Sequence, residues 1–178
     1  MLDGGGDPKG SPLPFRPTDG RVGALKFYPI CINLIGAKVV VIGAGRVAEP
    51  KLRRVLESGA RVTVIAPEAT AQITAWAKRK KLQWKRRRVK SGDVHHAKFV
   101  ITATDDARLN AKIARLAMRQ KILVNAATGK ATGDVTLPAV AQVRGVTIAI
   151  STGGKSPKLA RRLREQFERI LRSSEFKL

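Results

Sequence analysis

The chain has 178 residues, and 43% of them are hydrophobic, which is enough for one ordinary domain with a core plus a small additional unit. Thirty-five Lys and Arg against 13 Asp and Glu give a net charge of +22, so an anionic partner is expected: nucleic acid, an acidic membrane surface or a polycarboxylate substrate. The single cysteine, Cys31, excludes a disulfide framework and a cysteine-based zinc cluster and favours a reducing compartment, by default the cytoplasm. The longest apolar runs are strand-sized, so we expect no membrane span.

Residues 1–26 are rich in Gly and Pro and are predicted to form a disordered leader, because they have too few apolar side chains to offset the entropy of ordering. From residue 37 onward, short β-branched runs alternate with helical patterns. The predicted strands are 38–42, 61–65, 82–89, 98–103 and 122–125, and the predicted helices are 47–57, 69–80 and 107–120. This alternation predicts an α/β fold with a Rossmann-like, doubly wound, mostly parallel sheet covered by helices.

The pattern changes after Gly129. Residues 137–143 and 146–150, separated by Arg144-Gly145, predict a β-hairpin. Ser156 and Pro157 then supply an N-cap and a first-turn proline for a C-terminal helix. Leu159, Leu163, Phe167 and Leu171 recur on one face of this helix, which therefore needs a partner surface.

A glycine-rich turn, Gly43-x-Gly45-x-x-Ala48, follows a predicted strand directly and opens a helix. The first glycine permits a tight turn, the second lets the backbone approach a pyrophosphate, and the small third residue lets helix and strand pack closely. Unpaired N–H groups at the helix start attract the anion. A turn needed only for strand–helix packing is the alternative, but the strand, spacing and helix together favour a dinucleotide. The predicted cofactor-binding residues here are Gly43, Gly45, Arg46, Val47 and Ala48.

Glu68 follows the second predicted strand, about 20 residues beyond the turn, where an acid that binds the ribose of the cofactor is expected. No Arg or Lys stands beside it in the sequence to hold a 2′-phosphate, so NAD is favoured over NADP. A solvated residue in the first turn of the next helix is an equally consistent interpretation of Glu68.

Further motifs extend over most of the chain. They are residues 28–34, Val47-Ala48-Glu49-Pro50-Lys51, Ala103-Thr104-Asp105-Asp106 with Asn110, Val124-Asn125, Leu137-Pro138-Ala139 and residues 150–157. Together with the glycine turn they resemble the precorrin-2 dehydrogenase and sirohydrochlorin ferrochelatase domain of siroheme synthases. The resemblance implies NAD-dependent oxidation of precorrin-2 to sirohydrochlorin, in some members followed by insertion of ferrous iron, in a homodimer. Residues 27–136 would then be the NAD-binding domain, and 137–178 a dimerisation hairpin with an amphipathic helix, the helical tail being truncated.

The resemblance also implies site residues. Thr104, Asp105, Asn110 and Asn125 would line the cofactor side of a cleft at the carboxyl ends of the strands. Thr152, Gly153, Lys155 and Ser156, at a second helix N-terminus, would face the substrate, a tetrapyrrole octacarboxylate that would account for the positive charge. The alternatives are helix capping for Thr104 and Asp105 and an ordinary glycine-rich connection for the second set.

The chain departs from the family at the expected general base. The family usually carries an aspartate shortly after the Val-Asn pair, as general base and metal-handling group, and an ungapped match puts Thr128 there. The threonine hydroxyl can hydrogen-bond a substrate, but it cannot serve as the general base, because it lacks a pKa in the range of a carboxylate. Asp134, the nearest carboxylate in sequence, is the candidate substitute, and a turn residue beside Gly133 is the alternative. The family also continues with further helices, so dehydrogenation is favoured over iron insertion.

Residues 78–90 contain nine basic residues and no acid, flanked by Trp76 and Trp84. Such a run could bind nucleic acid through counterion release and base stacking, but a solvated helix end and edge strand with buried tryptophans is favoured, because no known nucleic-acid module is present. His95-His96 predicts a polar turn rather than a metal site, since adjacent residues of an extended segment point to opposite sides. The rival function is a non-catalytic NAD-sensing or nucleic-acid-binding Rossmann protein.

Overall fold

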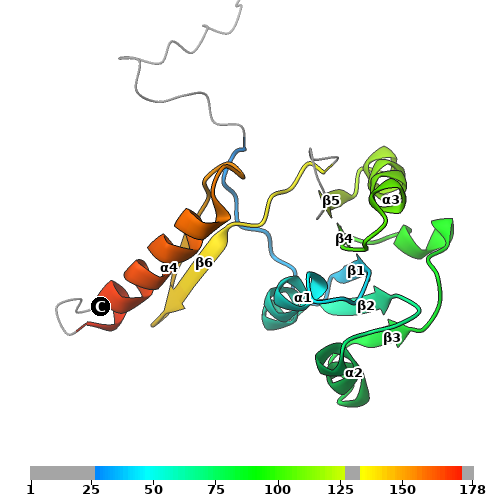
Figure 1. The fold of residues 1–178 in the computed structure, drawn as a ribbon, viewed down its shortest axis with the longest axis horizontal. Helices are drawn as coiled ribbons and strands as arrows, with labels where there is room; N and C mark the ends of the chain where they lie inside the picture. Colours follow the sequence, from blue (N-terminus) through cyan, green and yellow to red (C-terminus); the bar gives the residue numbers. More distant parts are fainter. Residues whose placement is uncertain (1–26, 127–132, 174–178) are drawn as a thin grey trace, which may run out of the picture.

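A computed structural model describes residues 27–126 and 133–173, so the predicted leader and Thr128 lie outside the described residues. Five parallel strands form the main sheet in the order β3-β2-β1-β4-β5 (Figure 1). Their bounds are β1 Lys38–Ile42, β2 Arg61–Ile65, β3 Gln83–Lys85, β4 Phe99–Thr102 and β5 Leu123–Ala126. The strand order reverses between β1 and β4, which confirms the predicted Rossmann-like, doubly wound sheet.

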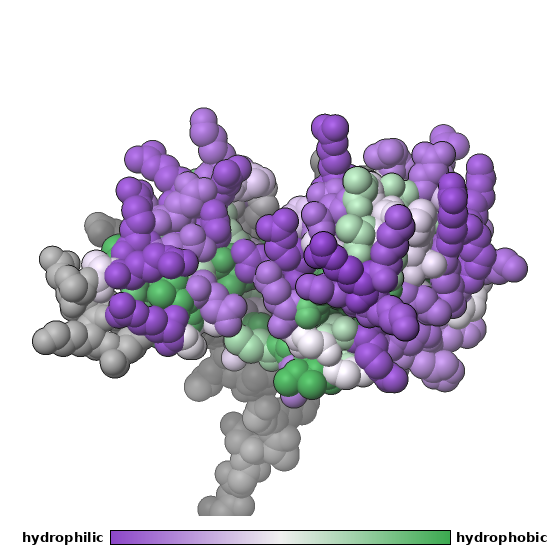
Figure 2. Space-filling model, turned by 90° about the horizontal axis from the view of Figure 1, so that it is seen from below, coloured by the Kyte–Doolittle hydropathy of each residue, from purple (hydrophilic) through white to green (hydrophobic). Residues whose placement is uncertain are grey.

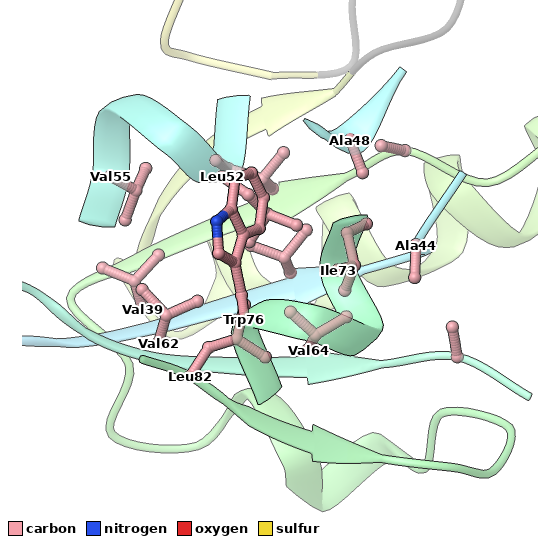
Figure 3. Packing of buried hydrophobic residues seen from close by; sticks show 14 of the residues in the cluster. Val39, Ala44, Ala48, Leu52, Val55, Val62, Val64, Ile73, Trp76 and Leu82 are labelled. Atoms are coloured by element: carbon pink, nitrogen blue, oxygen red, sulfur yellow. The ribbon is translucent and has the colours of Figure 1, made fainter. Parts of the chain in front are cut away.

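Helices cover both faces of this sheet, because almost every residue of the central strands β1 and β4 is buried. Helices α1 (Ala48–Glu57) and α2 (Ala71–Lys78) pack on one face, and α3 (Ala107–Arg119) and the 3₁₀ turn η1 (Ser91–Val94) pack on the other. Successive side chains of a strand point to opposite faces, so β1 contributes residues to both cores. Figure 3 shows the first core, in which the Trp76 indole lies among aliphatic side chains of the sheet and α1.

Strand β3 is shorter than predicted, ending at Lys85 rather than near residue 89. The Arg87 backbone N–H donates to the Lys85 carbonyl (2.8 Å), which turns the chain away from the sheet. The Arg87 guanidinium then donates two 2.7 Å hydrogen bonds to the Asp93 carboxylate, which also accepts from the Lys90 N–H. These bonds hold the connection between β3 and η1 in a turn, so the basic run does not continue as a strand.

This turn makes a prediction about acid stability. The hydrogen bond from Arg87, supported by the Lys90 N–H, lowers the pKa of Asp93 to about 2, whereas an unfolded aspartate titrates near 3.9. A carboxylate whose pKa is lower in the folded than in the unfolded state stabilises the folded protein. This contribution is fully present above the pKa of the unfolded state, and it is lost as the pH falls through the pKa of the folded state. We therefore expect Asp93→Asn to destabilise the protein at pH 6 in urea titrations, with the difference from wild type shrinking between about pH 4 and pH 2. A difference independent of pH over this range would contradict the assignment.

A second unit follows the main sheet. Strands β6 (Ala139–Val143) and β7 (Val146–Ile150) form an antiparallel hairpin, and α4 (Pro157–Arg172) packs on it, chiefly on β6. Arg144 and Gly145 have φ of 49° and 80°, as a two-residue hairpin turn requires. The Ser156 hydroxyl accepts from the Leu159 N–H (3.2 Å), which confirms the predicted cap. Figure 1 shows this unit to one side of the parallel sheet.

Within residues 27–126 and 133–173, no helix is long and apolar enough to cross a membrane.

Candidate nucleotide site

A cavity of about 1040 Å³ lies at the carboxyl ends of β1, β2 and β4, beside the point where the strand order reverses. In open α/β sheets this is the place where ligands bind, because the connections diverge there to opposite faces. The lining comes from four connections: residues 42–47 after β1, 65–70 after β2, Arg88 and Val89 after β3, and 103–106 with Leu109 after β4. The predicted residues Gly43, Gly45, Arg46, Val47, Thr104 and Asp105 all line this cavity.

The glycine turn fits a phosphate ligand. Gly43 has a φ of 101°, and a Cβ there would lie 2.3 Å from the Ala103 carbonyl oxygen, so only glycine lets the turn pass this close to β4. A Cβ on Gly45 would meet nothing within 4 Å, so its backbone faces open space on the cavity side. Helix α1 begins with no side-chain hydrogen bond to its first turn, but Pro50 there has no N–H and the Ala48 N–H donates to the Gly45 carbonyl (3.0 Å), so residues 45–47 of the turn would supply most of the N–H groups for an anion. Ala48 is fully buried and serves the close packing of helix and sheet.

The loop after β4 is held by Asn110, which is 1% exposed. Its Oδ1 accepts from the Thr104 backbone N–H (3.2 Å) and hydroxyl (2.8 Å), and its Nδ2 donates to the Thr104 carbonyl (2.7 Å). Asn110 therefore fixes the shape of the cavity wall through Thr104 and does not itself line the cavity. Helix α3 is capped by neither Thr104 nor Asp105: the Asp106 carboxylate accepts from the Leu109 N–H at 2.9 Å.

Asn125, at the end of β5, lies at the junction of the sheet with the second unit. Its Oδ1 accepts from the Lys51 ammonium (2.8 Å), and its Nδ2 donates to the Val135 carbonyl (2.9 Å). Burial lowers the pKa of the Lys51 ammonium. Asn125 thus joins α1, β5 and the segment before β6, and it does not line the cavity.

Asp134 lies along the free edge of β5. One of its carboxylate oxygens accepts from the Val124 backbone N–H (2.7 Å), and the next residue, Val135, donates its N–H to the Val124 carbonyl (2.9 Å). Residues 133–135 therefore satisfy backbone groups of an edge strand that would otherwise lack partners. Thr128, the other predicted catalytic residue, falls in the stretch between the two described ranges.

The second predicted anion site lies in the hairpin and helix unit. Thr152 accepts from the Lys155 and Ser156 backbone N–H groups, through its carbonyl (3.1 Å) and hydroxyl (3.1 Å) respectively. Ser156 caps α4, and the Gly153 N–H donates to the Ser151 hydroxyl (3.2 Å). The structure brings Thr152, Gly153, Lys155 and Ser156 together as one turn, but none of them lines the nucleotide cavity.

The tryptophans of the basic run belong to the core side of the sheet. Trp76 is 8% exposed, and the half-buried Trp84 donates its indole N–H to the Ala66 carbonyl (3.0 Å) while the Arg86 guanidinium lies 5.7 Å from its ring centroid. Neither ring is a free platform for a base, as the favoured interpretation predicts. His95 and His96 lie in a shallow hollow at the amino ends of β4 and β5, with their ring centroids 6.3 Å apart.

Sequence reasoning missed several parts of the cavity wall, among them residues 66–70 other than Glu68, Arg88 with Val89, and Leu109. Arg88 matters most, because the preference for NAD over NADP assumed that no cation stands near Glu68. The signal lay in the pairing register of β3 with β2, which places the connections that follow the two strands next to each other. That register cannot be read before the two strands are known to be neighbours.

The fold and the cavity define a nucleotide-binding domain of the Rossmann class. Residues 30–139 match the family described as "Putative NAD(P)-binding", and residues 145–170 match the one described as "Sirohaem biosynthesis protein central". The precorrin-2 dehydrogenase of Bacillus subtilis is 33% identical over 143 residues, covering 80% of this chain and 88% of that protein. The chain belongs to the family of precorrin-2 dehydrogenases and siroheme synthases.

Two further relatives give the extent of the match. The siroheme synthase of Nitrosococcus oceani is 35% identical over 147 residues, covering 83% of this chain but 31% of that protein, so the chain spans about a third of the length of such a synthase. Among solved structures, that of SirC, a precorrin-2 dehydrogenase, has a TM-score of 0.71 and 32% identity, covering 81% of this chain and 71% of that one. The likeness to SirC therefore includes both the parallel sheet and the architecture of the second unit.

Proposed function

We propose that this chain is an NAD-dependent precorrin-2 dehydrogenase, which oxidises precorrin-2 to sirohydrochlorin in siroheme biosynthesis. The observation that carries the proposal is the cavity at the strand reversal, formed by a glycine turn that would admit a pyrophosphate and by the loop that Asn110 holds. The named activity of relatives that align over most of this chain supports the choice of substrate. Iron insertion is left out, because the aspartate expected to handle metal is replaced at Thr128.

The residues of the cavity have distinct tasks in this reaction. NAD, when bound, supplies the acceptor for the hydride that leaves the macrocycle. The N–H groups of residues 45–47, just before α1, and the Arg46 side chain would hold the pyrophosphate, while Thr104 and Asp105 would position the nicotinamide half. Asn110 acts through Thr104 and is a positioning residue. The net charge of +22 would draw the octacarboxylate substrate towards the protein.

Oxidation also requires that a proton leave the substrate, and we propose that Asp134 accepts it, with the Thr128 hydroxyl as a hydrogen-bonding group. Lys155 and the other residues of the turn 152–156 would bind substrate carboxylates through their side chains, chiefly the Lys155 ammonium, because the Gly153, Lys155 and Ser156 N–H groups already donate within the turn. Because Asp134 also bonds the Val124 N–H, its two roles need separate variants. Asp134→Asn keeps an acceptor oxygen and should leave stability within about 0.5 kcal/mol while lowering turnover at least tenfold, whereas Asp134→Ala should also destabilise by about 1–2 kcal/mol in urea titrations. Normal turnover by Asp134→Asn would restrict this residue to its structural role.

The experiment for the activity itself is anaerobic conversion of precorrin-2 with NAD, followed by the absorbance of NADH and of sirohydrochlorin. Gly45→Asp should abolish turnover, because it puts a carboxylate where the pyrophosphate lies. Gly92→Asp is the matched control, since its Cβ is also unobstructed but lies in η1, away from the cavity. No turnover by a wild-type protein that binds NAD tightly would instead support an NAD-sensing or other binding protein.

We further propose that the protein is cytoplasmic, because the single, exposed Cys31 fits a reducing environment. We also propose that the unit of residues 137–178 forms a homodimer. Helix α4 exposes Leu159, Phe167 and Ile170 at 47%, 38% and 51%, although Ala160 and Leu171 are buried. Figure 2 shows apolar side chains between hydrophilic ones on the unit at the left of the view, which contains α4. Phe167→Asp with Ile170→Asp should give monomers in light scattering, whereas Arg161→Asp and Arg162→Asp should not. A monomeric wild-type protein would contradict the proposal.

A further inference from the structure

Two residues of opposite charge, Glu68 and Arg88, line the nucleotide cavity from the connections after two neighbouring strands. Strands β2 and β3 pair in parallel, with Ile65 opposite Lys85, and the contact continues beyond the strands. The Ala66 N–H donates to the Lys85 carbonyl (3.3 Å), and the Arg86 guanidinium donates to the Pro67 carbonyl (3.4 Å). The two connections therefore run side by side, which brings Glu68 of one and Arg88 of the other to the cavity wall.

Of the three consecutive arginines at positions 86–88, Arg88 is the one that lines the cavity. Arg86 lies over the Trp84 ring and bonds Pro67, and Arg87 is held by its bidentate pair with Asp93. Neither of them lines the cavity, whereas Arg88 does. Within the described ranges, no ion pair includes Arg88, so no carboxylate neutralises its charge.

The position of this pair indicates which part of a dinucleotide it meets. In the Rossmann fold the residues after the second strand contact the adenosine ribose: an acid accepts from the 2′-hydroxyl, and a nearby arginine accommodates a 2′-phosphate. This site carries both. Glu68 is the acid that the sequence predicts, and Arg88 is a cation that lines the same cavity from the neighbouring connection. A guanidinium can donate two parallel hydrogen bonds to a phosphate.

We propose that Arg88 forms a subsite for the 2′-phosphate of NADP, so that this protein binds NADP as well as NAD. The proposal rests on the dinucleotide site of the proposed function and concerns its selectivity. Glu68 favours NAD by accepting from the ribose hydroxyl, and it repels a phosphate at the same position. Arg88 offsets that repulsion, and the two side chains together make the site tolerant of both cofactors.

The test is isothermal titration calorimetry of the whole chain with NADH and with NADPH, which needs no tetrapyrrole. In the wild-type protein the two dissociation constants should lie within about tenfold of each other. Arg88→Ala should weaken NADPH about 10- to 100-fold, the loss expected for a charged hydrogen bond, and change NADH less than about threefold. Glu68→Gln should strengthen NADPH and weaken NADH. Lys81→Ala, which removes one charge of the same basic run outside the cavity, should change neither.

Two results of the calorimetry would overturn the proposal. NADH binding with NADPH more than a hundredfold weaker, or equal losses for both cofactors in Arg88→Ala, would show that Arg88 holds no 2′-phosphate. Either result would leave the dehydrogenase proposal intact. Conversely, the expected calorimetry together with no conversion of precorrin-2 would refute the proposed reaction and support the 2′-phosphate subsite.

Discussion

Gly43→Ala is expected to destabilise the protein by about 2–5 kcal/mol and to abolish dinucleotide binding. The new Cβ would stand 2.3 Å from the Ala103 carbonyl oxygen and 2.6 Å from its carbon, which are backbone atoms of the neighbouring strand connection and cannot rotate away. The φ of 101° adds strain, since a side chain rarely adopts it. Urea denaturation gives the stability change, and calorimetry with NADH gives the loss of binding.

Gly45→Ala separates the two effects of the turn. Its Cβ has no neighbour within 4 Å, so stability should stay within about 0.5 kcal/mol of wild type. The methyl group would nevertheless occupy the approach of the pyrophosphate, so NADH should bind at least tenfold more weakly. Equal stability of Gly43→Ala and Gly45→Ala would contradict the close approach of β1 and β4 at this point.

Asn110→Ala should have the second large effect, a destabilisation of about 2–4 kcal/mol, because it removes the side-chain partner of the Thr104 N–H and carbonyl and the closer of the two partners of the Thr104 hydroxyl. The freed loop forms a wall of the cavity, so the affinity for NADH should also fall. Chemical denaturation and calorimetry measure the two consequences.

The matched control for Asn110 is Lys112→Ala, an exposed position on the same helix, which should change stability by less than about 0.5 kcal/mol. If Asn110→Ala lowered stability but left the affinity for NADH unchanged, the Thr104 loop would not be a determinant of the cofactor site. That result would limit Asn110 to a role in folding.

Local chemistry explains why much of the fold can be predicted. Strand β1 lies where five residues rich in β-branched side chains predict it, and α4 begins at the Ser156 cap, because alternation, helical period and capping depend on neighbours in the sequence. The glycine turn is equally local, since its function requires only a strand, a turn and a helix in succession. The sequence by itself therefore determined the class of fold, the position of the nucleotide site and the resemblance to a family.

Contacts between distant segments decided the rest. Arg88 and Glu68 line one cavity only because β3 pairs with β2, and the bonds of Asn125 to Lys51 and Val135 join segments that no periodicity connects. The residue that caps α3 proved to be Asp106, since the Thr104 side chain is bonded to Asn110. Strand pairing and side-chain hydrogen bonding depend on which surfaces meet in three dimensions, and for that reason the place of Arg88 in the cavity wall emerged only from the tertiary structure.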